Sequence, residues 1–278
     1  MFRNSSNVLI NGGTFTDHHE NHHTPSSEVN NCWRQHLSGH SITQLIGWFI
    51  GKFGWDNFVL WLHGPAGTGK SAIAQTFAEL CAKRNRLLAI FFFSRSDLRQ
   101  NNEKTFVATL AYQLWLQIHE SWPIIEAAIS NNPAIFQLNF NAQFRTPFLD
   151  PLLQLSRARR FTSGTPYPNL IIIDGLHECN GADVQSTILN TISNAPQRHR
   201  SALPFKFLVV SRPEYHLTTS FSVAALHSLT FRLALDDTYR PNMDIRLYLV
   251  DSFCEIRNTH IIRAIFQIHG QALVSLNC

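Results

Sequence analysis

The residues whose types and spacing carry the clearest chemistry lie at positions 61 to 71, which read WLHGPAGTGKS. Gly64, four further residues and then Gly69, Lys70 and Ser71 give the pattern G-x-x-x-x-G-K-S, which is typical of a loop that binds nucleotide phosphates. The pattern follows an apolar run and precedes an amphipathic one, as a strand-loop-helix unit requires. The alternative is a glycine-rich turn that holds no ligand.

Each residue type in this loop has a physical role. The glycines allow positive φ angles, which turn successive N–H groups toward one anionic group. A helix that begins at Lys70 adds the partial positive charge of its N-terminus. We expect Lys70 to reach the β and γ phosphates and the Ser71 hydroxyl to bind Mg²⁺. The predicted nucleotide-binding residues are Gly64, Pro65, Ala66, Gly67, Thr68, Gly69, Lys70 and Ser71.

A second group of chemical residues follows the apolar run in NLIIIDGLHE, residues 169 to 178. Asp174 stands where a buried strand ends, and ligands of open α/β sheets bind at that end. A carboxylate there suits Mg²⁺, and Glu178 can act as the general base toward an attacking water. The alternatives are a capping carboxylate at Asp174 and an ordinary surface acid at Glu178.

A third group lies in FLVVSRPEY, where Arg212 follows another apolar run. The planar guanidinium suits phosphate, so Arg212 is a candidate sensor of the γ phosphate. The alternative is an arginine that pairs with a carboxylate at the rim of the sheet.

The elements that must position these groups alternate along the chain between apolar runs and amphipathic stretches. This alternation predicts an α/β fold, a P-loop NTPase with a mainly parallel five-stranded sheet and helices on both faces. We predict strands at 57–63, 87–94, 169–175, 205–211 and 228–235. We predict helices at 71–82, 103–119, 123–130, 144–159 and 182–193.

The chain is predicted to have three parts. Residues 1–56 form a lead-in of a short hairpin or loop and then a helix, 57–236 form the nucleotide-binding domain, and 237–278 form a helical segment that ends abruptly. The lead-in contains HHENHH, with His18, His19, His22 and His23. A metal site there is one reading, and a polar solvated segment is the favoured one.

Composition limits the remaining function classes. The chain has 278 residues, 44% of them hydrophobic and 15% charged, which argues against disorder. The net charge of +4 falls in short clusters without interleaved aromatic residues, so nucleic acid is not an expected partner. The five cysteines form no Cys-x-x-Cys pair, and no stretch is long and apolar enough to span a membrane. We therefore expect a cytoplasmic protein.

Four segments together resemble a known family: FVLWLHGPAGTGKSAIAQTFAE, LAIFFFSRSD, NLIIIDGLHEC and FKFLVVSRPE. In this order they resemble the NACHT-type P-loop NTPase domain of fungal signalling proteins, in the STAND class, also described as a nephrocystin-3-like N-terminal domain. The resemblance implies that the strands before the phosphate loop and before Asp174 flank the strand before Arg212. It also implies a Mg²⁺-nucleotide complex and a slow switch with Glu178 as catalytic acid and Arg212 as sensor.

Two departures from the family pattern modify this expectation. His177 stands where the family often has an acid in DGLDE, which weakens the expectation of hydrolysis. The last residues do not match the family, and the lid and repeat domains that usually follow are not in this sequence, which suggests a truncated product.

The expected function is binding of Mg²⁺ with ATP or GTP, and slow hydrolysis. ATP is favoured because the guanine-reading Asn-Lys-x-Asp motif is not in the sequence. The rivals are a binding module without turnover, a P-loop kinase and an inactive fragment. The expected partners are a nucleoside triphosphate and, through the resemblance, a second copy or a signalling partner.

Overall fold

The computed structural model describes residues 40–53, 57–158, 167–199 and 205–235. The predicted N-terminal hairpin, the histidines between positions 18 and 23 and the segment 237–278 lie outside these ranges. No helix in the described ranges is both long enough and apolar enough to cross a bilayer.

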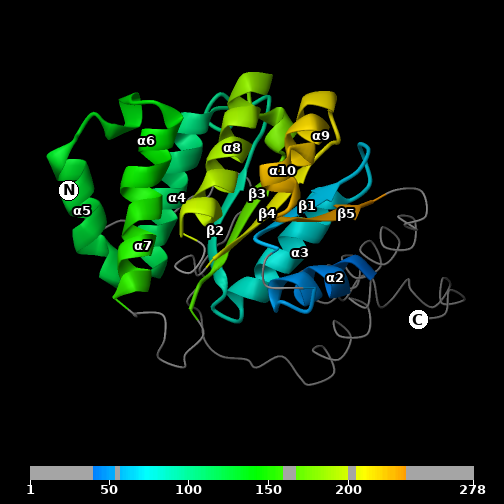
Figure 1. Ribbon diagram of the computed structural model, residues 1–278, viewed down its shortest axis with the longest axis horizontal. Helices are drawn as coiled ribbons and strands as arrows, with labels where there is room; N and C mark the ends of the chain where they lie inside the picture. Colours follow the sequence, from blue (N-terminus) through cyan, green and yellow to red (C-terminus); the bar gives the residue numbers. More distant parts are fainter. Residues whose placement is uncertain (1–39, 54–56, 159–166, 200–204, 236–278) are drawn as a thin grey trace, which may run out of the picture.

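Five strands form one sheet in the order β2-β3-β4-β1-β5, and every neighbouring pair is parallel (Figure 1). Each strand lies within one of the five apolar runs, so the predicted five-stranded α/β architecture is confirmed. β4 lies between β1 and β3, as the family resemblance implied. The strands are β1 (Val59–His63), β2 (Leu87–Phe92), β3 (Leu170–Asp174), β4 (Lys206–Ser211) and β5 (Thr230–Ala234).

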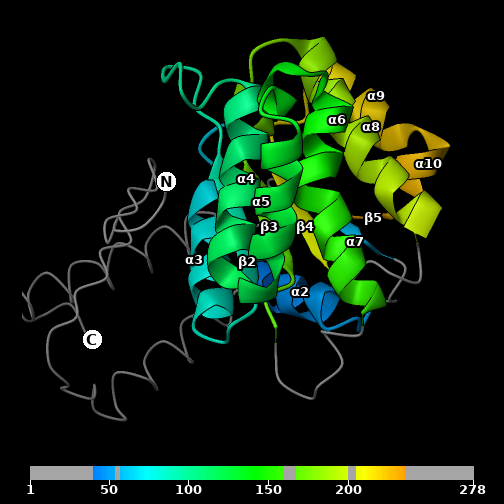
Figure 2. The ribbon, with the colours of Figure 1, turned by 90° about the vertical axis from the view of Figure 1, so that its left-hand side faces the viewer.

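Helices cover both faces of the sheet (Figures 1 and 2). On one face, α2 (His40–Phe49) and α3 (Lys70–Ala82) pack against Leu60, Leu62 and the strand residues that point the same way. On the other, the remaining helices pack against Val59 and the alternate strand residues. These helices are α4 (Glu103–Gln117), α5 (Trp122–Asn131), α6 (Phe140–Phe144), α7 (Asp150–Arg157), α8 (Ala182–His199), α9 (Tyr215–Ser222) and α10 (Ala224–His227).

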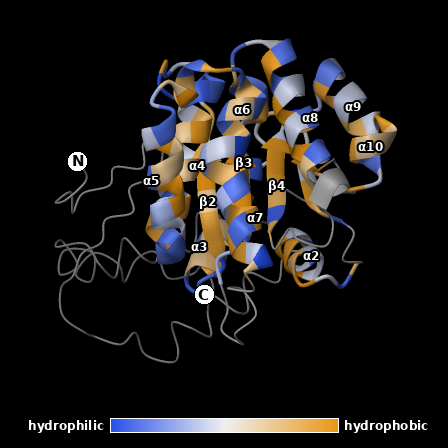
Figure 3. Cartoon of the chain, turned by 60° about the vertical axis from the view of Figure 1, so that its left-hand side comes forward, coloured by the Kyte–Doolittle hydropathy of each residue, from blue (hydrophilic) through white to orange (hydrophobic). Residues whose placement is uncertain are grey.

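Burial on both sides explains why the strands are apolar throughout. All residues of β3 and β4 are buried, and Figure 3 shows orange, hydrophobic colouring along most of β4. A strand that is covered on only one face would alternate between apolar and polar residues. The continuous apolar runs therefore reflect the two helical layers that cover the sheet, as the sequence predicted.

The predicted helix at 144–159 is three consecutive segments in the structure. α6 is followed by a π-helical turn, η3 (Arg145–Leu149), and then by α7. Pro147 lies inside η3 and Pro151 lies at the start of α7. Proline has no N–H and its ring clashes with the carbonyl of the preceding turn, so the α-helical hydrogen-bond pattern cannot continue unchanged through both positions.

A side chain protects the backbone of edge strand β2. The Gln113 amide on α4 accepts a hydrogen bond from the Ile90 N–H at 2.8 Å and donates one to the Ile90 carbonyl at 2.8 Å. An edge strand has unpaired backbone groups on one side, and unpaired buried groups are costly. Gln113 satisfies two of them and ties α4 to the sheet.

Candidate functional site

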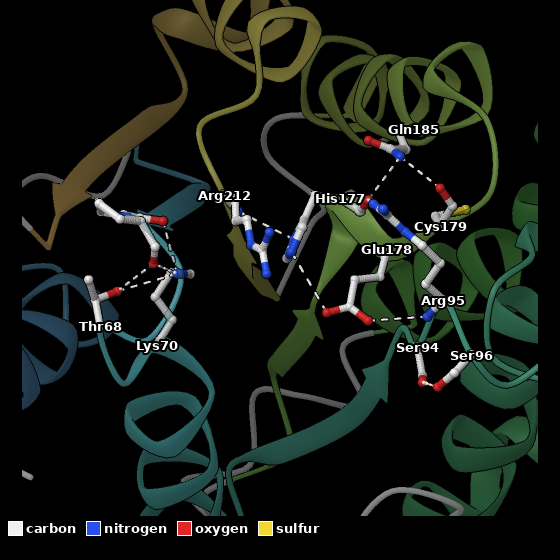
Figure 4. A network of polar contacts seen from close by, with 12 residues as sticks. Thr68, Lys70, Ser94, Arg95, Ser96, His177, Glu178, Cys179, Gln185 and Arg212 are labelled. Atoms are coloured by element: carbon white, nitrogen blue, oxygen red, sulfur yellow. Dashed lines mark hydrogen bonds and ion pairs between the residues drawn. The ribbon is translucent and has the colours of Figure 1, made fainter.

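The candidate residues gather at the carboxyl end of the sheet because all five strands run the same way. The phosphate loop follows β1, Asp174 ends β3 and Arg212 follows β4. Figure 4 shows the Lys70 side chain, Arg212, His177 and Glu178 in one region. The predicted site residues therefore meet at the sheet edge where ligands of α/β proteins bind.

The backbone of the phosphate loop has the predicted positive φ angle at two of its three glycines, and Gly64 does not have one. Gly67 and Gly69 have φ angles of 78° and 77°, in the left-handed region, and no atom would touch a Cβ at either position. Gly64 is required for a different reason, because a Cβ there would lie 2.5 Å from the Leu235 carbonyl oxygen. Gly69 is also the N-cap of α3 and provides no side-chain cap. Within the described ranges, the start of α3 therefore has no side-chain cap.

Lys70 is folded into the phosphate loop. Its Nζ donates to the Gly64 carbonyl at 2.9 Å, to the Pro65 carbonyl and to the Thr68 hydroxyl at 3.3 Å. Burial and then the positive charge of Arg212 lower the pKa of Lys70, and Asp174 opposes this shift. The ammonium therefore rests on oxygen atoms of the loop, the kind of partner that a phosphate oxygen can replace.

Ser71 and Asp174 lie close together, although they come from different motifs. The Ser71 hydroxyl and the Gly175 N–H both lower the pKa of the Asp174 carboxyl. Asp174 is only 5% exposed, and this burial raises its pKa against the effect of these two donors. A hydroxyl and a carboxylate are the hard oxygen ligands that Mg²⁺ prefers, so the pair fits this ion.

Glu178 reaches the site from the short 3₁₀ helix η4 (Leu176–Glu178), which begins after Gly175. One carboxylate oxygen accepts the Arg95 N–H at 3.1 Å, and the other lies 3.7 Å from Nε2 of His177. The side chain is 36% exposed, so water can reach it. In Figure 4 the carboxylate lies between His177 and the Arg95 backbone.

Arg212 lies at the end of β4 with an exposed side chain. Its positive charge lowers the pKa of both Lys70 and His177, which places the guanidinium near these two groups. Its backbone N–H donates to Nδ1 of His177 at 3.3 Å. The alternative ion pair with a rim carboxylate is not formed among the described residues.

A pocket of about 450 Å³ lies beside Glu178, on the side of α8 and the β2–α4 loop. Glu178 and His177 line it, and the sequence had not singled out its other polar lining residues. Arg95 could have been found, because it follows the apolar run of β2 at the same sheet edge. The other lining residues carry no motif. The polar lining residues include Arg95, Asn101, Gln185, Glu214 and His216.

The thiol next to Glu178 is not poised for chemistry. Cys179 is buried, and burial raises its pKa to about 12, so it is protonated at neutral pH. No group of three or more histidine, cysteine, aspartate or glutamate residues that could hold a metal occurs in the described ranges. The candidate groups for chemistry in this region remain the phosphate loop, Asp174 and Glu178.

Comparison with solved structures gives matches of low identity. Drosophila ORC bound to GC-rich DNA and Cdc6 matches with a TM-score of 0.45 and 12% identity, over 88% of this chain and 38% of that one. Drosophila ORC bound to poly(dA/dT) DNA and Cdc6 matches with a TM-score of 0.43 and 14% identity, over 87% of this chain and 39% of that one. This chain thus spans about two fifths of the length of those proteins. No curated protein matches it.

The family comparison is more specific. The family model described as "Nephrocystin 3, N-terminal" matches residues 48–212, which is 165 of the 278 residues. The matched region begins in α2 and ends at Arg212, so it includes the phosphate loop, Asp174 and Glu178. The chain belongs to the nephrocystin 3 N-terminal family.

Proposed function

We propose that this chain binds a nucleoside triphosphate together with Mg²⁺ and hydrolyses it slowly, as the switch domain of a NACHT-type signalling protein. The observation that carries this proposal is the juxtaposition of Ser71 and Asp174: β1 and β3 run parallel and end on the same side of the sheet, and the Ser71 hydroxyl is close enough to lower the pKa of the Asp174 carboxyl. This arrangement brings the last residue of the phosphate-loop motif to the carboxylate that ends β3, directly at the N-terminus of α3. A turn without a ligand would not need this pair of oxygen ligands.

Binding follows from the groups in the loop. The N–H groups at the start of α3 and the left-handed glycines favour an anion, and Lys70 exchanges its contacts with loop carbonyls for contacts with phosphate oxygens. Ser71 and Asp174 would hold Mg²⁺, which neutralises charge on the phosphates when bound. ATP is the favoured nucleotide because the sequence contains no guanine-reading Asn-Lys-x-Asp motif.

Hydrolysis requires a group that accepts a proton from water. Glu178 is the candidate because its carboxylate is partly exposed and is held by the Arg95 N–H. The Arg212 guanidinium, near Lys70, would contact the γ phosphate and compensate the charge that develops on it.

A second candidate function, binding without turnover, is favoured by one observation. One carboxylate oxygen of Glu178 accepts the Arg95 N–H, and the other faces His177 at 3.7 Å. Both carboxylate oxygens therefore already have a neighbour, which restricts the access of an attacking water to the proposed base. Turnover and binding therefore need separate measurements.

Nucleotide binding is tested by thermal unfolding with Mg²⁺-ATP, with Mg²⁺-GTP and with their non-hydrolysable analogues. A ligand at 100 times its dissociation constant should stabilise the protein by about 2.7 kcal/mol. Lys70→Ala should abolish this shift, whereas Lys83→Ala, which removes an exposed lysine at the end of the same helix, should retain it. A full shift in Lys70→Ala would overturn the proposal.

Turnover is tested by phosphate release from saturating Mg²⁺-ATP. Glu178→Gln should keep the thermal shift and reduce phosphate release about 100-fold, because general-base catalysis contributes at least that much. A wild-type protein that shows the shift and releases no phosphate would establish the second candidate function.

The proposed signalling role and cytoplasmic location are supported by the resemblance to fungal NACHT proteins alone. A second copy or a signalling partner would be the receiver of the nucleotide state. Size measurement of the purified protein with and without Mg²⁺-ATP tests whether nucleotide changes its assembly.

A further inference from the structure

The imidazole of His177 lies between the candidate general base and the end of β4. Its Nδ1 accepts the Arg212 N–H at 3.3 Å, and its Nε2 lies 3.7 Å from a carboxylate oxygen of Glu178. Figure 4 shows the ring between these two residues. The side chain is only 7% exposed, so little water competes for either nitrogen.

The contact at Nδ1 determines where the imidazole carries its proton. A nitrogen that accepts a hydrogen bond from a backbone N–H is unprotonated, so in the neutral ring the hydrogen is on Nε2. Burial lowers the pKa of His177, with a further contribution from Arg212, against the raising effect of Glu178. The Nε2–H group is therefore the side of the ring nearest the Glu178 carboxylate, at 3.7 Å, which is close to but beyond hydrogen-bond length.

The backbone of His177 is held as firmly as its ring. Its carbonyl oxygen accepts the Arg95 guanidinium at 3.1 Å and the Gln185 amide at 3.4 Å. These donors come from the β2–α4 loop and from α8. The ring is therefore anchored by a hydrogen bond at Nδ1 and by the two hydrogen bonds to its own backbone carbonyl, and an oriented ring can transmit position.

We propose that His177 is a positioning residue, which sets the place of the Glu178 carboxylate by linking it to the Arg212 backbone at the end of β4. This inference rests on the proposed function. A shift of the Arg212 backbone moves the imidazole, and the imidazole moves the oxygen that would accept a proton from water. His177 thereby couples the proposed phosphate sensor to the proposed base.

Two amide substitutions separate the two contacts of the ring. In His177→Asn, the amide oxygen can replace Nδ1 as acceptor for Arg212, but the donor toward Glu178 is lost. In His177→Gln, the amide nitrogen can replace Nε2 as donor. We expect kcat of ATP hydrolysis to fall about tenfold in His177→Asn, because the partner that orients Glu178 is lost. In His177→Gln that partner is kept, so kcat should stay within about threefold of wild type.

The KM and nucleotide-induced thermal shift should stay unchanged in both variants, because neither contact reaches the phosphate loop. His227→Asn is the matched control, because it removes an exposed histidine at the end of α10. Equal kcat values in wild type and in folded His177→Asn, or a change in KM alone, would overturn the inference.

Imidazole NMR gives a readout that does not depend on turnover. The signals of His177, identified by their loss in His177→Asn, should show an unprotonated Nδ1 and a protonated Nε2. Glu178→Gln should shift the Nε2 resonance, and Lys83→Ala should not. A protonated Nδ1, or no response to Glu178→Gln, would overturn the link itself.

If the wild-type protein releases no phosphate while these NMR signals are as expected, the proposal of hydrolysis is rejected, and the proposed link from Glu178 through His177 to β4 is retained.

Discussion

At the scale of single residues, the site contains a carboxylate that works against the stability of the fold. Asp174 is buried, and burial disfavours its charged form more than the Ser71 and Gly175 hydrogen bonds favour it. Its pKa therefore lies above the ordinary value of 3.8. Functional sites commonly contain groups that reduce stability in this way, which agrees with the proposed role of Asp174 as a Mg²⁺ ligand.

The sign of the pKa shift predicts the behaviour of Asp174→Asn. Because the folded-state pKa is raised, the folded protein binds this proton more tightly than the unfolded chain does. The favourable contribution is complete below the ordinary pKa and is lost as pH rises through the raised one. At pH 7, Asp174→Asn should therefore unfold at a higher temperature than wild type without ligand, and should flatten the acid part of the stability profile.

The same variant should respond less to nucleotide. Asn supplies a neutral ligand in place of a charged one, so the additional thermal shift from Mg²⁺-ATP should shrink. Glu120→Gln, at an exposed acid, is the control, and its stability should stay within about 0.5 kcal/mol of wild type. A destabilised Asp174→Asn would show that the carboxylate is a net stabiliser and that its pKa is not raised.

At the scale of elements, one turn decides where Glu178 lies relative to Asp174. Gly175 joins β3 to η4 with a φ of 72°, and a Cβ there would lie 2.8 Å from the Phe93 carbonyl oxygen. The Phe93 N–H donates to the Asp174 carbonyl at 2.8 Å. This hydrogen bond fixes the backbone of Phe93, so the Phe93 carbonyl cannot easily move away from a new Cβ. Close approach of backbone and a left-handed φ both require glycine here.

Two glycine substitutions separate these requirements. Gly67→Ala changes a residue with a φ of 78° and no neighbouring atom near the new Cβ, so it should cost only about 1–2 kcal/mol for the backbone conformation. Gly175→Ala should cost about 1–3 kcal/mol more, because the methyl group also meets the Phe93 carbonyl. Urea unfolding measures both. Equal losses would mean that the β3–η4 turn yields without resistance.

Sequence patterns were sufficient for the elements that are buried on both faces. The strands appeared as apolar runs because two helical layers leave no polar side, and the phosphate loop appeared because its glycines serve backbone geometry. The break at η3 needed attention to Pro147, which the helical periodicity conceals. The contact of Gln113 with Ile90 depends on which strand lies at the sheet edge, and a single polar residue on an apolar helix does not reveal this.

The candidate site was predictable only in part, for a similar reason. Asp174, Glu178 and Arg212 lie at or just after the carboxyl ends of strands, where ligands of α/β sheets bind, so they could be predicted from the sequence. Arg95 contacts Glu178 through its backbone N–H, which any residue type has, so the sequence carries no sign of that contact. His177 was interpreted as a missing acid, whereas in the structure it makes two contacts of its own.

At the scale of the whole molecule, the site depends on a helix that precedes the predicted nucleotide-binding domain. α2 lies before residue 57, yet Leu45 and Trp48 are fully buried in the same core cluster as α3 and one face of the sheet. The Trp48 indole donates to the Asn57 carbonyl at 2.9 Å, and Lys206 of β4 lies 5.2 Å from its ring. α2 therefore supports the helix whose N-terminus is the proposed phosphate site.

This packing predicts that α2 belongs to the cooperative unit of the nucleotide domain, and Trp48→Ala tests it. Removing a fully buried aromatic side chain from the core leaves a cavity under α3, so the free energy of unfolding should fall by about 3–5 kcal/mol. Ile50→Ala is the control. Ile50 lies just past the end of α2 and is 58% exposed, so its truncation should cost less than about 1 kcal/mol. Losses of similar size in the two variants would place the domain boundary at residue 57, because a helix outside the cooperative unit could lose its core contacts without unfolding the sheet. A much larger loss in Trp48→Ala would place the boundary before α2.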